Sequence, residues 1–294
     1  MKIALMDSGI GLLAAAAAVR RARPDADLVL SLDPDGMPWG PRDADGITER
    51  ALLCARAAAA HEPQALIVAC NTASVHALPA LRAELEPALP VIGTVPAVKP
   101  AAAAAATTGG RVAIWATPAT TGSPYQQQLI EEFANGADIT GVPCHGLAEA
   151  IENGDEALIS AAVEAAARRT PGYAQTVVLG CTHYELVGER IREALGGSDS
   201  RSGPGPGPGH GSDSGSGHGS DSGPRPGPDG PALQGSAVAV CAQALRRAGI
   251  RPEPGAAPTG GLTVLHSGRT STLPAAALTY AEGRLLAPAA AARG

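Results

Sequence analysis

Two cysteines of this chain occupy equivalent settings. Cys70 and Cys181 each close a short apolar run rich in branched residues, and small polar residues follow them, within Ala65–Ser74 and Thr176–Tyr184. A free thiol has a pKa of about 8.5, which nearby cations or helix N-termini lower, so it can exchange protons near neutral pH. Two thiols on opposite sides of one carbon could remove a proton from one face and deliver one to the other. The pair therefore predicts inversion of a carbon centre without a cofactor.

Two titratable side chains, Asp7 and His183, are expected to lie near these thiols. Asp7 follows the first apolar run of the chain, and His183 lies two residues after Cys181. We expect them to tune the cysteines and relay their protons, although Asp7 could instead cap the helix that follows it. A disulfide switch and a single nucleophilic cysteine with a histidine are alternative uses of the thiols. A nucleophile and its base need only one cysteine, so that alternative leaves the duplication unexplained.

The apolar runs are typical of buried parallel strands, whose carboxyl ends bind ligands in open α/β sheets. The strand pattern also repeats: Lys2–Gly9 and Arg111–Pro118 are both basic-then-apolar runs that enter a small or polar turn. Their offset of 109 residues (111 − 2) is close to the cysteine offset of 111 (181 − 70). These offsets predict two α/β halves of similar plan, each of which brings one cysteine to a shared cleft.

Further strands are expected near residues 27–32, 91–95, 138–144 and 262–266, with helices near 45–61, 236–247 and 275–285. At the first strand-to-helix turn, Gly9 and Gly11 permit close backbone approach, and the helix N-terminus offers free amides to an anion. Residues 197–234 consist mainly of Gly, Pro, Ser and Asp and contain a seven-residue motif twice. Such a segment buries too little apolar surface to offset its ordering entropy, so we expect a disordered insertion.

The composition excludes several classes of protein. The net charge of −6 argues against a nucleic-acid partner, and no apolar run approaches the length of a membrane span. The sequence begins with an apolar run that we interpret as a strand, so we expect no secretory leader. Five cysteines without CxxC or HxxxH spacing fit reduced thiols better than disulfides or a metal site. We therefore expect a cytoplasmic protein with no metal, no nucleic-acid partner and no membrane contact.

Several motifs together resemble the glutamate racemases of the aspartate/glutamate racemase family, in the order found there: Asp7–Gly11, Pro38–Gly40, Ala69–Ser74, Pro96–Pro100, Leu147–Gly154 and Leu179–Tyr184. The resemblance covers about residues 2–195. It implies an α/β fold of two pseudosymmetric parallel-sheet domains with the active site in the cleft between them. The first domain would comprise 1–96 and 235–286, the second 97–196, and the insertion 197–234.

The resemblance also implies roles for individual residues. Cys70 and Cys181 would be the catalytic thiols, assisted by Asp7 on one side and by His183 and Glu152 on the other. Glu152 is preferred to Glu149 because it falls at the acidic position just before Asn-Gly. The implied substrate contacts are Asp7, Ser8, Trp39, Gly40, Asn71, Thr72, Thr117, Thr120, Thr182 and His183. No cofactor or metal is implied, and a homodimer is one option for the assembly.

Three positions depart from the family pattern: Leu12 replaces a usual Gly, Trp39 a usual Tyr, and Glu185 a usual Pro. We expect an isomerase that interconverts L- and D-glutamate and supplies D-glutamate for peptidoglycan. Leu12 and Trp39 could narrow the cleft, which leaves open a racemase of aspartate or another small acidic substrate. A non-catalytic, racemase-like binding protein is the alternative from another class, but it would not need both thiols with Asp7 and His183.

Overall fold

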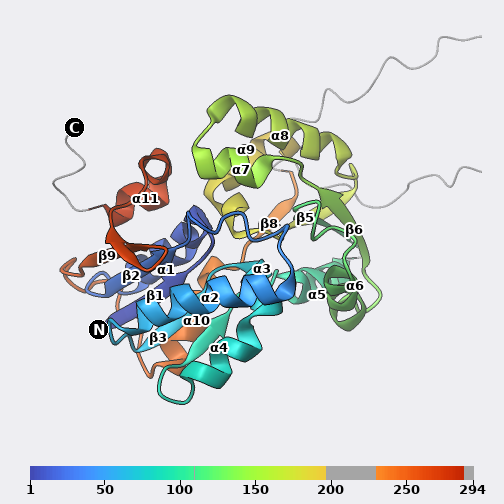
Figure 1. Cartoon of the computed structure of the whole chain (residues 1–294). Helices are drawn as coiled ribbons and strands as arrows, with labels where there is room; N and C mark the ends of the chain where they lie inside the picture. The colour runs from blue at the N-terminus through green and yellow to red at the C-terminus, as the bar shows by residue number, and fades with distance from the viewer. Residues whose placement is uncertain (109, 197–229, 288–294) are drawn as a thin grey trace, which may run out of the picture.

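A computed structural model describes residues 1–108, 110–196 and 230–287 and contains two predominantly parallel β-sheets (Figure 1). The six-stranded sheet has the order β10-β9-β2-β1-β3-β4, and the four-stranded sheet has the order β6-β5-β7-β8. The strands of the first sheet are β1 (Lys2–Met6), β2 (Asp27–Leu32), β3 (Ala65–Val68), β4 (Val91–Gly93), β9 (Leu262–His266) and the antiparallel β10 (Arg269–Ser271). The strands of the second are β5 (Arg111–Ala116), β6 (Asp138–Pro143), β7 (Ala174–Leu179) and β8 (Ala232–Gln234).

The helices of the two halves follow their strands. Helical elements of the larger half are η1 (Ile10–Leu12), α1 (Leu13–Ala22), α2 (Ala44–Ala59), α3 (Asn71–His76), α4 (Leu78–Leu85), α10 (Ala237–Arg247), η4 (Ala275–Thr279) and α11 (Ala281–Leu286). Those associated with the smaller sheet are α5 (Val98–Thr108), α6 (Pro124–Phe133), α7 (Leu147–Asn153), α8 (Glu156–Arg169), η2 (Thr182–Val187) and α9 (Gly188–Gly196). The segment after residue 230 first adds β8 to the smaller sheet and then returns to the larger half (Figure 1).

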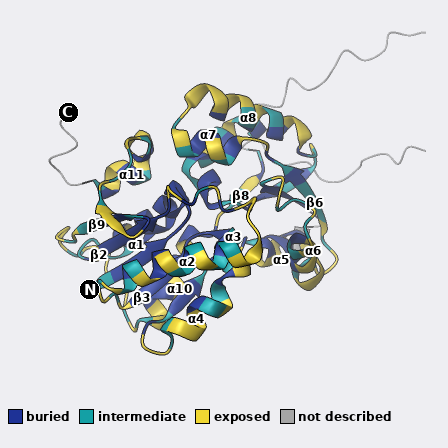
Figure 2. Ribbon diagram, in the orientation of Figure 1, coloured by how far each residue is buried: buried dark blue, intermediate teal, exposed yellow. Residues whose placement is uncertain are grey.

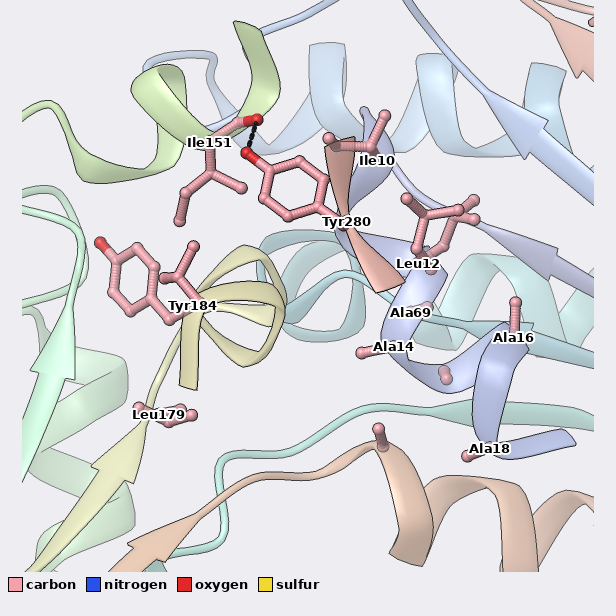
Figure 3. Packing of buried hydrophobic residues seen from close by; sticks show 14 of the residues in the cluster. Ile10, Leu12, Ala14, Ala16, Ala18, Ala69, Ile151, Leu179, Tyr184 and Tyr280 are labelled. Carbon is pink, nitrogen blue, oxygen red and sulfur yellow. Dashed lines mark hydrogen bonds between the residues drawn. The ribbon is translucent and has the colours of Figure 1, made fainter. Parts of the chain in front are cut away.

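The core is built from aliphatic side chains, because the chain has few large rings. Residues of β1, β3 and β7 are almost fully buried, and helices cover the strands (Figure 2). The alanines of α1 are buried between α10 and α11, where their small side chains allow close helix packing. One hydrophobic cluster spans both halves, and Figure 3 shows Leu12, Tyr184 and Tyr280 within it. The two halves therefore share a core.

The predicted α/β class with parallel sheets is confirmed. The two halves also share a strand order, because β2-β1-β3-β4 in one sheet corresponds to β6-β5-β7-β8 in the other. Cys70 and Cys181 therefore follow corresponding strands, β3 and β7. The division of the chain into domains at the stated boundaries stays a prediction. None of the helices in the described ranges is long and apolar enough to cross a membrane.

The structure corrects two expectations about the C-terminal part. Ala232–Gln234, assigned above to the insertion, forms β8, because it pairs with Thr176–Val178 and Leu233 packs against the core. Residues 197–229, for which disorder was predicted, lie outside the described residues. The expected helix 275–285 is two elements, because Tyr280 has an extended backbone and directs its ring into the core. Its hydroxyl donates to the Ile151 carbonyl oxygen at 2.6 Å, drawn as the dashed line in Figure 3.

Candidate active site

A cavity of about 580 Å³ lies where the carboxyl ends of β1, β3, β5 and β7 meet. This volume is in the range of small-molecule sites. Its walls come from Asp7 and Ser8, the loop 37–41, residues 70–72, the turn 117–120, helix α7 and residues 180–183. Both proposed catalytic cysteines line it, one from each sheet.

Cys70 lies at the N-terminal end of α3, in an extended conformation that continues β3. The Asp7 carboxyl group and the backbone amide of Ala73 are the polar groups that act on this thiol. Burial raises the pKa of Cys70 well above its ordinary value, and the negative charge of Asp7 raises it further. The resting state of this sulfur is therefore the thiol, with a carboxylate next to it that can accept its proton.

Asp7 is 1% exposed and sits between the two halves of the site. It accepts a hydrogen bond from the Ser8 amide at 2.7 Å and one from the Thr182 hydroxyl at 3.3 Å. Burial raises the pKa of Asp7 to about 6, although the nearby His183 and the Cys70 thiol act in the opposite direction. A carboxyl group with this pKa can take up and release a proton near neutral pH.

The second thiol has an imidazole as its partner. Cys181 Sγ lies 3.8 Å from His183 Nδ1, and His183 Nε2 donates to Glu152 Oε2 at 2.8 Å. Burial alone lowers the pKa of His183, but its hydrogen bonds to Cys181 and Glu152 outweigh that effect and raise the pKa well above 6.5. The imidazolium, which the Glu152 carboxylate stabilises, can therefore give a proton to this sulfur and take it back.

Gly9 and Gly11, in the turn after β1, leave room for the side chains of the site. A Cβ at Gly11 would lie 2.5 Å from Asp7 Oδ2 and 2.6 Å from His183 Nδ1, and a Cβ at Gly9 would collide with the Glu152 carboxylate. The Ile10 amide donates to Glu152 Oε2 at 2.8 Å. The close approach to the backbone at these glycines, predicted from the sequence, is present. The helix N-terminus also offers an amide to an anion as predicted, but that anion is the Glu152 carboxylate of the chain itself.

All the other residues predicted to contact the substrate line the same cavity: Ser8, Trp39, Gly40, Asn71, Thr72, Thr117, Thr120 and Thr182. The hydroxyls of Thr117 and Thr120 are 3.1 Å apart. The Asn71 amide donates to the Gly180 carbonyl at 2.8 Å, while its buried Oδ1 has no partner within the described part of the chain. Asn71 Oδ1 is therefore available as an acceptor for a bound molecule.

The charged side chains at the cavity wall are Asp7, Glu149, Glu152 and His183; none of the lining residues in the described ranges is a lysine or arginine. A carboxylate bound here would be held by hydroxyls and amides. Of the two glutamates weighed above, Glu152 is the one bonded to His183. The Ile10 amide and the Gly180 carbonyl were missed, because a backbone group at a site leaves no side-chain signature in the sequence.

Comparison with known proteins agrees with this arrangement. The family model described as Asp/Glu/Hydantoin racemase matches residues 11–198. The chain belongs to this family. The match covers the Cys70 and Cys181 motifs, and it identifies the protein as an isomerase, an amino-acid racemase, which confirms the resemblance noted in the sequence.

Individual relatives are similar over a large part of their length. The chain is 42% identical to the glutamate racemase of Pseudomonas putida over 196 residues, which are 63% of this chain and 70% of the relative. It is 40% identical over 206 residues to that of Roseiflexus sp., covering 67% of this chain and 72% of the relative. The crystal structure of Escherichia coli glutamate racemase with L-glutamate and the activator UDP-MurNAc-Ala has a TM-score of 0.67 at 28% identity, covering 86% of this chain and 84% of that one.

Proposed function

We propose that this protein interconverts L- and D-glutamate by passing protons between two cysteines, without a cofactor. The observation that carries the proposal is the pair of thiols at one cavity. They follow corresponding strands of two sheets, and each has its own proton-holding partner, Asp7 for Cys70 and the His183–Glu152 pair for Cys181.

The reaction needs one proton transfer on each face of the α-carbon. The thiolate on one face takes the α-proton and becomes a thiol, and the resulting carbanion takes a proton from the thiol on the other face, which becomes a thiolate. Asp7 beside Cys70 and His183 beside Cys181 then restore the starting protonation, because each exchanges protons with its own cysteine and with solvent. Because both transfers are between sulfur and carbon, no oxidant or electron acceptor is required.

Glutamate is the proposed substrate because the relatives compared above are glutamate racemases. Its carboxylates would be held by the hydroxyl and amide groups of Ser8, Asn71, Thr72, Thr117, Thr120 and Thr182, with Gly40 and Trp39 completing the wall. Its ammonium group would face the acidic side chains and Asn71 Oδ1. Supply of D-glutamate for peptidoglycan, a cytoplasmic location and a homodimer are parts of the same proposal. Aspartate stays the alternative substrate.

Circular dichroism of L-glutamate and L-aspartate with the purified enzyme, without added cofactor, tests the proposal. We expect the optical signal of glutamate to decay to zero. Cys70→Ala and Cys181→Ala should each abolish the decay, because each removes one proton carrier. Cys241→Ala is the matched control, since this cysteine is buried in α10 away from the cavity. Near-normal turnover in either site variant would refute the two-thiol mechanism.

Isotope entry gives an independent check. In heavy water, deuterium should appear at the α-carbon of the product from the first turnover, because thiols exchange with solvent between turnovers. Product without solvent label would indicate hydride transfer or a single sequestered base instead.

A further inference from the structure

The loop 37–41 lines the cavity, and its largest side chain, Trp39, packs into a buried hydrophobic cluster with Met6 and Ile47. Trp39 is 1% exposed and lines the cavity together with its neighbours in the loop 37–41. The α-carbon of the substrate must lie between the sulfurs of Cys70 and Cys181 in the proposed reaction. The loop 37–41 is a wall segment separate from the two cysteine segments, residues 70–72 and 180–183. With the α-carbon at the cysteines, this loop is assigned the remainder of the substrate, which for an acidic amino acid is the side chain.

The indole of Trp39 is held by a buried carboxylate. Trp39 Nε1 donates to Asp33 Oδ2 at 2.8 Å, and Asp33 is 0% exposed. The same oxygen accepts from Arg50 Nε at 2.7 Å, and Oδ1 accepts from the Ser267 hydroxyl at 2.7 Å and from Arg50 Nη2. Burial alone would raise the pKa of Asp33, but these hydrogen bonds outweigh it, and the pKa lies below its ordinary value. Asp33 is therefore a carboxylate at neutral pH, and both of its oxygens are fully partnered.

The remaining contacts fix this carboxylate in place. Ser267 lies in the turn between β9 and β10 with a left-handed φ of +46°, and its amide donates to the Leu32 carbonyl at 2.8 Å. Gly36 has no Cβ where one would collide with Asp33 and with Arg50, so Arg50 can reach the carboxylate. The hydrogen bonds of Asp33 thus join the end of β2 to α2, through Arg50, and to the β9–β10 turn, through Ser267. This turn lies outside the region 11–198 that matches the family.

We propose that Asp33 is a positioning residue that fixes Trp39 and with it the cavity-lining loop 37–41, and that the fixed loop limits the length of the acidic side chain that the site accepts. The inference rests on the proposed racemase function. A buried carboxylate with four donors tolerates little displacement, because any lost bond leaves a buried polar group unpaired. The indole N–H cannot leave Asp33 without that penalty. The loop that Trp39 anchors therefore acts as a rigid wall rather than one that yields to a longer substrate.

The test compares Asp33→Asn with Asp35→Asn. Asp35 is a matched control, because it is a carboxylate in the same loop that pairs with Arg269 at the surface, shares only Ser267 with Asp33 and has no bond to the indole of Trp39. We expect Asp33→Asn to raise the KM for L-glutamate about tenfold with a smaller change in kcat, and to lower the preference for glutamate over L-2-aminoadipate, one methylene longer, by about tenfold. Asp35→Asn should leave both values within about twofold of wild type.

A spectroscopic readout separates this inference from the proposed function. The chain has two tryptophans, so a Trp115→Phe background leaves Trp39 as the fluorophore. Asp33→Asn in that background should increase acrylamide quenching of Trp39 severalfold, whether or not the enzyme acts on glutamate. Ser267→Ala, which removes one donor and keeps the Arg50 pair, should change quenching and preference in the same direction to a smaller extent if Asp33→Asn fails to fold. Unchanged quenching and unchanged preference in the folded variants would overturn the proposal.

Discussion

The two thiols of the site differ in the residues beside them. Cys70 has a buried carboxyl group, Asp7, beside it, whereas Cys181 has an imidazole, His183, which Glu152 supports. The raised pKa of Asp7 shows that its carboxylate is less favourable in the folded protein than in water. The same burial that adapts Asp7 to proton transfer therefore costs stability when Asp7 is ionised.

We predict that Asp7→Asn flattens part of the pH dependence of stability. The pKa of Asp7 rises from 3.8, the ordinary value of an aspartate in water, to about 6 in the fold, so the folded state binds more protons in this interval. The contribution of Asp7 to stability is then greatest below about pH 4 and falls as the pH rises to about 6, by roughly 3 kcal/mol. Denaturant unfolding of both proteins across this range measures the difference.

The Asn variant should consequently equal or exceed the wild type in stability at pH 7 while losing racemisation. A parallel pH profile of the two proteins between about pH 4 and 6 would contradict the assignment of this slope to Asp7. Cys70→Ala, which leaves Asp7 in place, serves as the companion variant and should retain the slope.

Among the elements, α10 begins in an unusual way. Its first amides are not capped by the side chain of its own N-cap residue, Ser236, but by Glu185 in the catalytic segment η2. Glu185 Oε1 accepts from the Ser236 amide at 2.8 Å, from the Ser236 hydroxyl at 2.9 Å and from the Ala237 amide at 3.2 Å. A negative side chain at this position also complements the helix dipole. The departure from the usual Pro thus couples the segment that carries His183 to a helix of the larger half.

We predict that Glu185→Ala lowers the free energy of unfolding by about 1–2 kcal/mol, because the helix loses its cap. Burial raises the pKa of Glu185 in opposition to the amides, so the charge itself adds little. Glu185→Gln, which keeps an acceptor oxygen, should recover most of the loss. Glu193→Ala in the exposed part of α9 is the control and should lie within about 0.5 kcal/mol of wild type. An Ala variant as stable as the Gln variant would show that the cap contributes nothing.

For the molecule as a whole, several contacts cross between the halves at the cavity. The Asn71 amide bonds to the Gly180 carbonyl, the Thr182 hydroxyl to Asp7, and the Ile10 amide to Glu152. The shared hydrophobic cluster lies behind them. A molecule that fills the cavity would add contacts to both halves at once, and it would bind the native state only.

We predict that D- and L-glutamate raise the melting temperature of the Cys70→Ala, Cys181→Ala double variant by about 5 °C at a concentration about 100 times Kd, which corresponds to about 2.7 kcal/mol. The double variant prevents turnover and keeps the hydroxyl and amide groups of the wall. γ-Aminobutyrate, which lacks the α-carboxylate, should give a much smaller shift. Adding Asn71→Ala should reduce the glutamate shift, and a shift that is the same for both ligands would argue against recognition of the α-carboxylate.

The sequence alone determined the α/β class, the paired cysteines and most of the proposed site. Strands such as Ala65–Val68 are short, apolar and buried on both faces, so they are visible as continuous branched runs. Cys70 and Cys181 were recognisable because reactive side chains directly after such runs fall at the ligand-binding edge of a parallel sheet. These features are local in the chain, and local pattern is what a single sequence records.

Tertiary structure alone decided the contacts that join distant segments. Strand β8 has three residues and is defined by pairing with β7, while Tyr280 interrupts the last helix because its ring enters a core made by other elements. The bonds from Asp33 to Ser267 and from Ile10 to Glu152 connect residues 234 and 142 positions apart. Such contacts depend on how whole sheets and helices pack, and the free energy of that packing belongs to no single stretch of the chain.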